Sequence, residues 1–260
     1  MEIDGIREVA LRAAKEAGAI IRQGLEQART IEYKGEKNLV TDIDRRSEEV
    51  IATLVRRELP GHSLMSEEGT RLQGDSGYRW FVDPLDGTTN YAHGYPCFCV
   101  SIGVEKDGEM IYGVVYDPSL EELFTAQRGE GAFLNGKRLH VSAVSRLSDA
   151  LLATGFPPDV ANAQENNLNH FINFIKRAQA VRRPGSAVLD LCYVAAGRFD
   201  GFWELRLNPW DVAAGALMVR EAGGRVTDLQ GQSLSLSRPR IVASNSVIHD
   251  EMLRVLASNA

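Results

Sequence analysis

The chain has 260 residues, of which 44% are hydrophobic and 25% charged, and its formal net charge is −6. This composition is ordinary for a soluble globular protein of one large or two modest domains, and the acidic balance argues against nucleic acid as the main partner. No apolar stretch reaches membrane-spanning length, and charges throughout residues 1–27 exclude a secretory signal. We therefore expect a cytoplasmic protein without a membrane partner.

Two helices are predicted at the start of the chain. Apolar residues recur at helical spacing over residues 3–27, which predicts an amphipathic helix. A second helix is expected from about Ser47 to Leu59, because Pro60-Gly61 is a strong helix stop. The chain then turns to β-like patterns.

Turn signals divide residues 97–141 into short β-like runs, among them Asp107-Gly108 and Asn135-Gly136. Such dipeptides favour tight hairpins, so this stretch predicts an antiparallel meander. Cys97 and Cys99 open it within an apolar run. Their spacing is not that of a zinc pair, and we expect them to be core thiols.

After about residue 148 the pattern alternates between strand and helix. Two halves of different layering thus meet near residue 145, which predicts an α+β half over residues 1–145 and an α/β half over residues 146–260. The predicted elements of the second half are a strand at Leu151–Thr154, helices at 166–179, 187–196 and 209–222, a strand at Ile241–Ala243 and a helix at 247–256.

Residues 80–90, Trp-Phe-Val-Asp-Pro-Leu-Asp-Gly-Thr-Thr-Asn, carry the strongest chemical signal. An apolar run stops at Asp83, and the following Pro and Gly predict a tight bend that holds Asp83 and Asp86 together. Two carboxylates on a rigid bend suit Mg²⁺, which prefers hard oxygen ligands. A polar turn, in which each Asp caps a backbone amide, is the alternative for this motif alone.

Two further segments bear on that choice. Glu67-Glu68 follows a short apolar run, and Trp210-Asp211-Val212-Ala213-Ala214-Gly215 opens a predicted helix. Together with Asp83–Asn90, these segments resemble the three signature segments of the inositol monophosphatase family, in the same order and at about the same spacing. The resemblance extends over the rest of the chain, from its first helix to its last.

The resemblance implies a fold and an activity. The fold would be a layered α/β/α/β/α sandwich of the α+β class, of the inositol monophosphatase and fructose-1,6-bisphosphatase type, with the active site between the two halves. Members of the family are Mg²⁺-dependent, Li⁺-sensitive phosphomonoesterases, and the resemblance further implies a homodimer.

The resemblance also assigns metal ligands. Glu67 and Asp83 would hold one Mg²⁺ ion together with the Leu85 carbonyl, and Asp83 would bridge to a second ion bound by Asp86 and Asp211; a third, weaker ion would lie near Glu67. Four carboxylates about 5 Å apart would repel by about 3 kcal/mol per pair at an effective dielectric near 20. Two or three cations make such a cluster favourable, and metals in this arrangement clamp the attacking and leaving oxygens of a phosphoryl transfer.

The catalytic roles follow from the same comparison. Thr88 and Glu67 would orient the attacking water, and Asp44, at the end of the family-like segment 39–44, would accept the Thr88 proton. Glu68 would support this group from behind. The amides of Gly87 and Thr88 would face the phosphate if a helix begins there.

Each of these residues also has a structural alternative. Asp211 would suit the start of a helix after Asn208-Pro209 because of the helix dipole. Thr88 is a good helix N-cap, and Asp44 suits the cap of the helix that follows it. Asp42 and Glu68 are interpreted more readily as solvated surface charges. Lys34 and Lys37 lie where the family has a basic residue near the metals, and the alternative for each is again a solvated side chain.

The predicted substrate contacts lie in the second half. Gly185, Ser186 and Ala187 resemble the loop that contacts substrate hydroxyls, and Glu204 resembles the residue that binds two ring hydroxyls, for which a carboxylate is well suited. Asp86, Gly87, Thr88 and Asp211 would complete the substrate site. Arg206 departs from the family, where many relatives have glycine; it would pair with Glu204 or offer a cation to a second anionic group.

These features predict Mg²⁺-dependent hydrolysis of a small-molecule phosphate monoester, foremost myo-inositol-1-phosphate. The alternatives within the fold are fructose-1,6-bisphosphatase, 3′-phosphoadenosine 5′-phosphate phosphatase and histidinol-phosphate phosphatase. Some bacterial relatives also act as partners of RNA polymerase or in ribosome biogenesis. The intact carboxylate set favours retained catalysis and leaves such an added role open.

Overall fold

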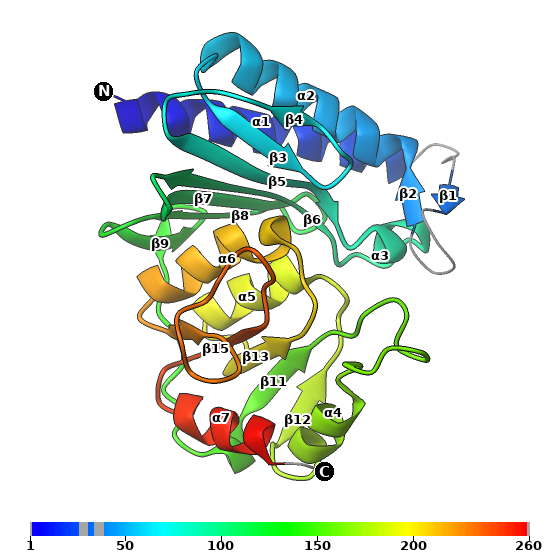
Figure 1. Cartoon of the computed structure of the whole chain (residues 1–260), viewed down its shortest axis with the longest axis vertical. Coiled ribbons are helices and arrows are strands. Elements are labelled where there is room, and N and C mark those ends of the chain that lie inside the picture. Colours follow the sequence, from blue (N-terminus) through cyan, green and yellow to red (C-terminus); the bar gives the residue numbers. More distant parts are fainter. Residues whose placement is uncertain (1, 26–30, 34–38, 259–260) are drawn as a thin grey trace.

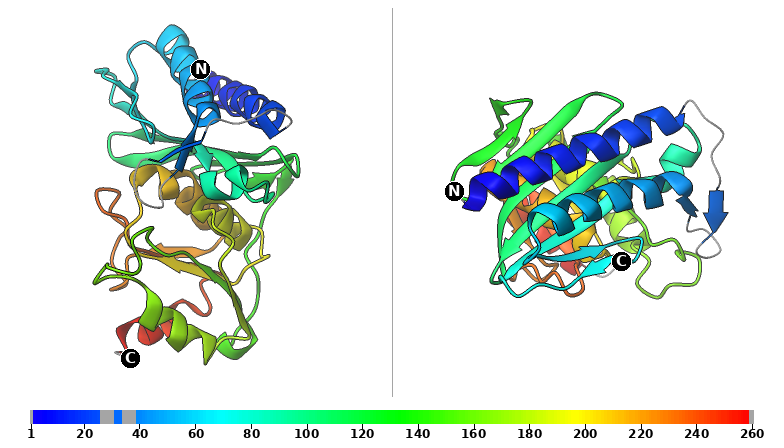
Figure 2. Two further views of the ribbon diagram at one scale, coloured as in Figure 1. Left: turned by 90° about the vertical axis from the view of Figure 1, so that its right-hand side faces the viewer. Right: turned by 90° about the horizontal axis from the view of Figure 1, so that it is seen from above.

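The computed structural model describes residues 2–25, 31–33 and 39–258. Its elements stack in five layers, helix on sheet on helix on sheet on helix (Figures 1 and 2). This arrangement confirms the layered α/β/α/β/α sandwich. Lys34 and Lys37 lie outside the described residues.

The first layer consists of α1 (Glu2–Leu25) and α2 (Asp42–Glu58), which lie side by side across the large sheet (Figure 2). Their apolar faces and one face of the sheet share a core around Ile6, Ile51 and Trp80. The sheet is formed by β3 (Ser63–Ser66), β4 (Arg71–Leu72), β5 (Tyr78–Asp86), β6 (Cys99–Lys106), β7 (Glu109–Asp117), β8 (Glu122–Gln127), β9 (Gly131–Leu134) and β10 (Lys137–Arg138).

The large sheet has the strand order β10-β9-β8-β7-β6-β5-β3-β4. Every neighbouring pair from β5 to β10 is antiparallel, which confirms the predicted meander. Among the described strands of this sheet, β3 and β5 form the one parallel pair. A separate two-stranded ladder joins β1 (Ile31–Tyr33) to β2 (Leu39–Thr41), and α3 (Thr88–Ala92) follows β5.

The middle layer consists of α5 (Ala187–Ala195) and α6 (Pro209–Glu221), which share a core with both sheets. The second sheet has the order β12-β11-β13-β15-β14, and α4 and α7 cover its outer face (Figure 1). These elements are β11 (Leu151–Thr154), β12 (Ala180–Arg182), β13 (Gly201–Glu204), β14 (Arg225–Thr227), β15 (Ile241–Ser244), the short 3₁₀ turn η1 (Leu147–Asp149), α4 (Leu168–Ile175) and α7 (His249–Ala257).

The predicted helix boundaries were wrong in two places. α2 begins at Asp42 rather than near Ser47, because two acidic residues in its first turn suit the helix dipole. α4 ends at Ile175 rather than at 179, because the chain must leave the helix to pair with β11 through β12. Cys97 and Cys99 are buried thiols, as expected. None of the described helices has the length and apolarity needed to cross a membrane.

Candidate active site

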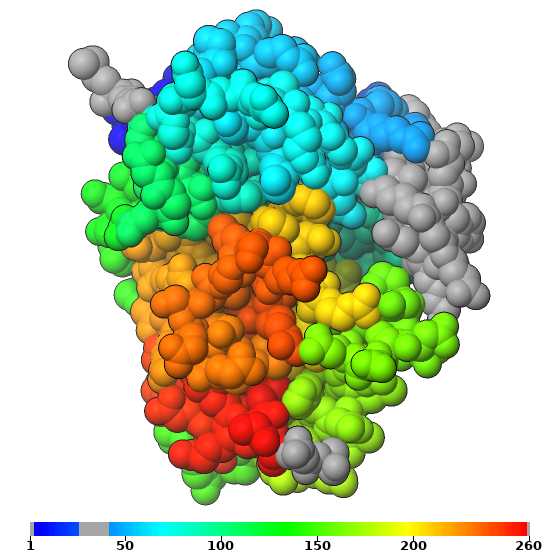
Figure 3. Space-filling view, in the orientation of Figure 1, coloured from blue at the N-terminus to red at the C-terminus, as the bar shows by residue number. Residues whose placement is uncertain are grey.

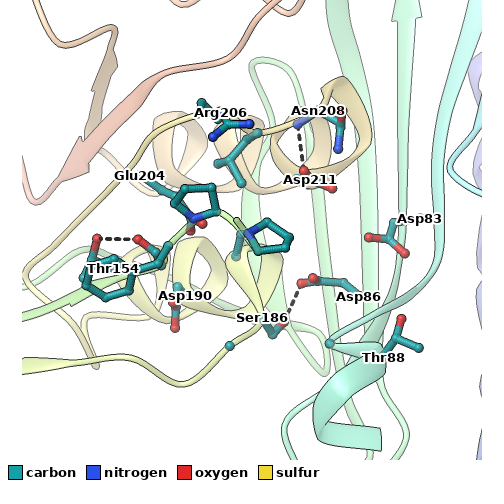
Figure 4. A pocket seen from close by; sticks show the side chains of 18 of the residues that line it. Asp83, Asp86, Thr88, Thr154, Ser186, Asp190, Glu204, Arg206, Asn208 and Asp211 are labelled. Atoms are coloured by element: carbon teal, nitrogen blue, oxygen red, sulfur yellow. Dashed lines mark hydrogen bonds between the residues drawn. The ribbon is translucent and has the colours of Figure 1, made fainter. Parts of the chain in front are cut away.

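A pocket of about 230 Å³ opens where the large sheet, the middle helices and the second sheet meet (Figure 4). Asp83, Asp86 and Thr88 lie on one side of it in this view, and Glu204 and Asp190 on the other. The sequence-predicted residues that line it are Glu67, Asp83, Leu85, Asp86, Gly87, Thr88, Gly185, Ser186, Ala187, Glu204, Arg206 and Asp211. The structure thus brings all predicted metal and substrate residues to one cavity.

Strand register places Glu67 beside Asp83. β3 runs parallel to β5 with Ser66 opposite Val82, and the Glu67 amide donates a 3.1 Å hydrogen bond to the Val82 carbonyl. The residues that follow Ser66 and Val82 are Glu67 and Asp83, so two carboxylates lie next to each other. Glu68 follows in the same turn and is partly buried.

Glu48 fixes that turn and was missed by the sequence analysis. It is 5% exposed on α2, and its carboxylate accepts hydrogen bonds from the Ser66 hydroxyl at 2.8 Å and the Thr70 amide at 2.7 Å. These contacts hold both ends of the segment that carries Glu67. The only sequence signal was an acidic residue on the buried face of a predicted helix.

The bend predicted after Asp83 takes the form of an irregularity within β5. The strand continues to Asp86, with a register shift against β6 between Asp83 and Asp86. Asp83 Oδ1 accepts the Leu85 amide at 3.0 Å. Gly87 then has φ 91°, and a Cβ atom there would lie 2.7 Å from the Cys97 carbonyl oxygen, so this position requires glycine.

Thr88 contacts Asp44, although their segments lie far apart in sequence. The Thr88 hydroxyl is 3.0 Å from Asp44 Oδ1 and 3.0 Å from the Leu85 carbonyl. The N-cap position of α3 belongs to Gly87, so Thr88 is not the N-cap considered above. Asp44 is 1% exposed within the first turn of α2.

Asp86 is tied to the start of α5. The Ser186 hydroxyl and the Val188 amide both donate to Asp86 Oδ2, the latter at 2.9 Å. Ser186 also caps α5 by accepting the Leu189 amide at 3.2 Å. The predicted substrate loop is therefore held directly against a predicted metal ligand.

Asp211 lies both at the start of a helix and in the pocket. Its Oδ2 accepts the Asn208 amide at 2.7 Å at the start of α6, so it does stabilise the helix terminus. It also lines the pocket near Asp83. The helix-capping reading therefore does not exclude the metal-binding one.

The carboxyl groups of this cluster act on one another. Burial, followed by the charges of Glu67, Asp86 and Asp211, raises the pKa of Asp83 well above its usual value. Burial raises the pKa of Asp86 to about 6, and burial and then Glu67 raise that of Asp211. Such mutual repulsion is relieved by protons or by a divalent cation.

The donor set fits Mg²⁺ in its chemistry, since it consists of carboxylates and one carbonyl. Among the described residues, no three His, Cys, Asp or Glu side chains already converge on a common metal position. Outside the pocket, Asp42 lies 3.9 Å from Arg46 at the surface, as expected for a solvated charge.

Glu204 stands at the end of β13, on the far wall of the pocket. It is 8% exposed, and burial raises its pKa to about 8. A Cβ atom on Gly155 would lie 2.3 Å from both of its carboxylate oxygens, so this close approach also requires glycine. Asp190 of α5 is a second buried carboxyl group in the pocket, and the sequence analysis missed it.

Arg206 pairs with Asp159 rather than with Glu204. Its guanidinium forms a fork with the two Asp159 oxygens at 2.7 and 3.2 Å, with side chains 41% and 53% exposed. Asp159 belongs to the loop between β11 and α4, and Glu165 of that loop accepts a hydrogen bond from Arg240. In Figure 3 this loop lies in green beside the orange segment that precedes β15. Arg206, one of whose predicted roles was to bind a second anionic group of the substrate, is therefore already paired with Asp159.

Arg206 has φ 60°, a left-handed conformation that disfavours side chains. Arg206→Gly loses an exposed ion pair worth about 0–1 kcal/mol but relieves about 1 kcal/mol of backbone strain. We expect its free energy of unfolding to stay within about 1 kcal/mol of the wild type. Arg206→Ala keeps the strain and should be about 1 kcal/mol less stable than Arg206→Gly. Urea unfolding of both variants measures this order, and the reverse order would show that the strain is absent.

Comparisons with known proteins agree with this geometry. The family model described as "Inositol monophosphatase family" matches residues 2–259. "Nus factor SuhB" of Pseudomonas aeruginosa is 45% identical over 95% of this chain and 94% of its own, and "Inositol-1-monophosphatase" of Mesorhizobium japonicum is 40% identical over 98% and 97%.

Solved structures show the same relation. The extragenic suppressor protein suhB of Bartonella henselae has a TM-score of 0.93 at 41% identity and covers 98% of this chain and 99% of its own. Inositol monophosphatase of Anabaena has a TM-score of 0.89 at 42% identity, with 98% and 96% covered. The chain belongs to the inositol monophosphatase family, a family of phosphatases.

Proposed function

We propose that this protein is a Mg²⁺-dependent phosphomonoesterase whose preferred substrates are polyol monophosphates, myo-inositol-1-phosphate foremost. The observation that carries the proposal is a single pocket with two chemically different walls. Mutually repelling carboxylates, Asp83 among them, form one wall, and buried Glu204 stands on the other. The first wall suits cations and phosphate, and the second suits hydroxyl groups.

Glu67, Asp83, Asp86, Asp211 and the Leu85 carbonyl are the groups that would hold Mg²⁺. Bound Mg²⁺ would neutralise phosphate charge, lower the pKa of water and stabilise the leaving oxygen. An IMPase/NADP phosphatase that is 26% identical to this chain has been solved in complex with NADP and Ca²⁺, which supports a divalent-cation site in this fold.

The protein's own groups would position the reactants. Thr88, held by Asp44 at 3.0 Å, would orient the attacking water, which would displace the alcohol from phosphorus in line. The Gly87 amide already acts on Asp86 and lowers its pKa, so it would reach phosphate only by exchange. Glu204 and the Gly185–Ala187 loop would hold the alcohol part of the ester.

Phosphate release from a substrate panel tests the proposal. With Mg²⁺, we expect kcat/KM for inositol-1-phosphate to exceed that for fructose-1,6-bisphosphate and adenosine 3′,5′-bisphosphate, because Arg206 is already paired with Asp159. EDTA should abolish turnover, and Mg²⁺ should restore it. Full turnover in EDTA, or preference for either bisphosphate, would contradict the proposal.

Glu204→Gln should affect substrate choice more than chemistry. Above the Glu204 pKa of about 8 the wild-type side chain is a carboxylate. The amide keeps its size but weakens acceptance from two hydroxyls, so at such a pH KM for inositol-1-phosphate should rise about tenfold, the scale of one charged hydrogen bond. KM for p-nitrophenyl phosphate, which has no hydroxyls, should change little. Equal effects on the two substrates would show that Glu204 is structural.

A second role in transcription is favoured by the names of several relatives. "Nus factor SuhB" proteins of Pseudomonas aeruginosa and Escherichia coli are 45% and 44% identical to this chain. Co-elution with purified bacterial RNA polymerase on size exclusion would support this role. Asp83→Asn should leave such an interaction intact, because Asp83 is buried and cannot form a contact surface.

A further inference from the structure

Asp190 is a buried carboxyl group that the catalytic proposal does not use. It is 1% exposed on α5 and lines the pocket together with Glu204. Its Oδ1 atom is buried and has no hydrogen-bond partner within the described part of the chain. Figure 4 shows it on the side of the pocket that holds Glu204 and Thr154, away from Asp83.

An unpaired carboxyl oxygen in such a place points to a ligand. Leaving a buried acceptor unsatisfied destabilises a fold. Of the described carboxyl groups with such an oxygen, Asp190 is the one that lines the pocket. The sequence around Asp190 is otherwise apolar, from Val188 to Val194, and Leu189, Leu191 and Cys192 are fully buried. The packing of α5 therefore does not explain the carboxyl group.

The charges around Asp190 leave this wall of the pocket short of a cation. Burial raises the pKa of Asp190 most, Glu204 on β13 and Asp86 on β5 raise it further, and only Arg183 lowers it. Arg183 is exposed at the rim and forms no salt bridge with either carboxyl group within the described residues. Arg206 also lines the pocket, but its guanidinium forms an ion pair with Asp159.

We propose that Asp190 and Glu204 form a subsite for a primary ammonium group on the alcohol part of the substrate. Amino-bearing polyol phosphates would then bind better than their all-hydroxyl counterparts, an inference that rests on the proposed phosphomonoesterase function. An ammonium group has three donors and a positive charge, so it would donate to the Asp190 carboxyl group and offset the charge of both carboxyl groups at once. A substrate hydroxyl supplies one donor and no charge.

The test compares glucosamine-6-phosphate with glucose-6-phosphate, which differ by one amino group in place of a hydroxyl. At neutral pH with Mg²⁺, kcat/KM should be roughly 10–100-fold higher for the amino sugar, the scale of a charge-assisted hydrogen bond. Asp190→Asn keeps the size and removes the charge, so the ratio should fall to about one. Glu165→Gln removes the same charge from an exposed loop position and should keep the wild-type ratio.

A wild-type ratio at or below one would overturn the proposal, as would a ratio that Asp190→Asn leaves unchanged. If Asp190→Asn does not fold, the wild-type ratio decides alone. Failure of the proposed function looks different, because then neither sugar phosphate nor p-nitrophenyl phosphate releases phosphate. In that case the ratio of the two dissociation constants, measured by titration calorimetry, decides whether the ammonium subsite exists.

Discussion

Asp83→Asn is expected to abolish Mg²⁺-dependent phosphate release, with a loss of a thousandfold or more in kcat. Asp83 is 2% exposed, and Glu67, Asp86 and Asp211 all act on it. As the proposed bridging ligand, it would lose its charge toward two ions at once. The amide oxygen keeps the hydrogen bond from the Leu85 amide, so the backbone of β5 should not change.

The same substitution should stabilise the metal-free protein at neutral pH. Because the pKa of Asp83 is raised in the folded state, that state binds more protons than the unfolded state above the ordinary Asp pKa. Wild-type stability therefore falls as the pH rises through this window, while Asn has no proton to lose. The advantage of the variant should be absent near pH 4 and grow toward neutral pH, as measured by chemical unfolding in EDTA.

Mg²⁺ should reverse the order of stability, because binding stabilises only the protein that retains its ligands. Asp117→Asn is a matched control: Asp117 is a fully buried carboxylate that accepts the Ser119 and Leu120 amides away from the pocket. Its Mg²⁺-dependent activity should persist. Turnover by Asp83→Asn at the wild-type rate would refute the metal-binding role of this residue.

The parts of the site that the sequence predicted are those held by local chemistry. Asp83, Asp86 and Gly87 lie within one strand and its following turn. Strand and turn signals of this kind depend on neighbours in sequence, so they survive folding. The meander from β6 to β10 was predicted for the same reason.

Other features depend on contacts that no local pattern encodes. Glu48 holds the turn of Glu67 across the interface between α2 and β3, and Asp190 faces the pocket only because α5 lies between two sheets. The Arg206 partner, Asp159, is 47 residues away in a loop. Local sequence shows the charge of such residues but not which side chain each one meets.

Removing the Thr88 hydroxyl or the Asp44 charge should each lower kcat about a hundredfold or more, the scale of a positioned proton acceptor. Thr88→Val removes the hydroxyl of the 3.0 Å contact, whereas Asp44→Asn keeps an oxygen acceptor there but removes the carboxylate charge. Because Asp44 would act on the water through Thr88, the double variant should be no slower than Thr88→Val alone, and KM should stay near the wild-type value.

Thr89→Val is the matched control for this cycle. Thr89 is the next residue of α3 and points to solvent, so the same change there should leave kcat near the wild-type value. Steady-state phosphate release at saturating Mg²⁺ measures all four variants. Multiplicative losses in the double variant would mean that Thr88 and Asp44 act independently, and the 3.0 Å contact would then serve to attach α3 to α2 rather than to orient water.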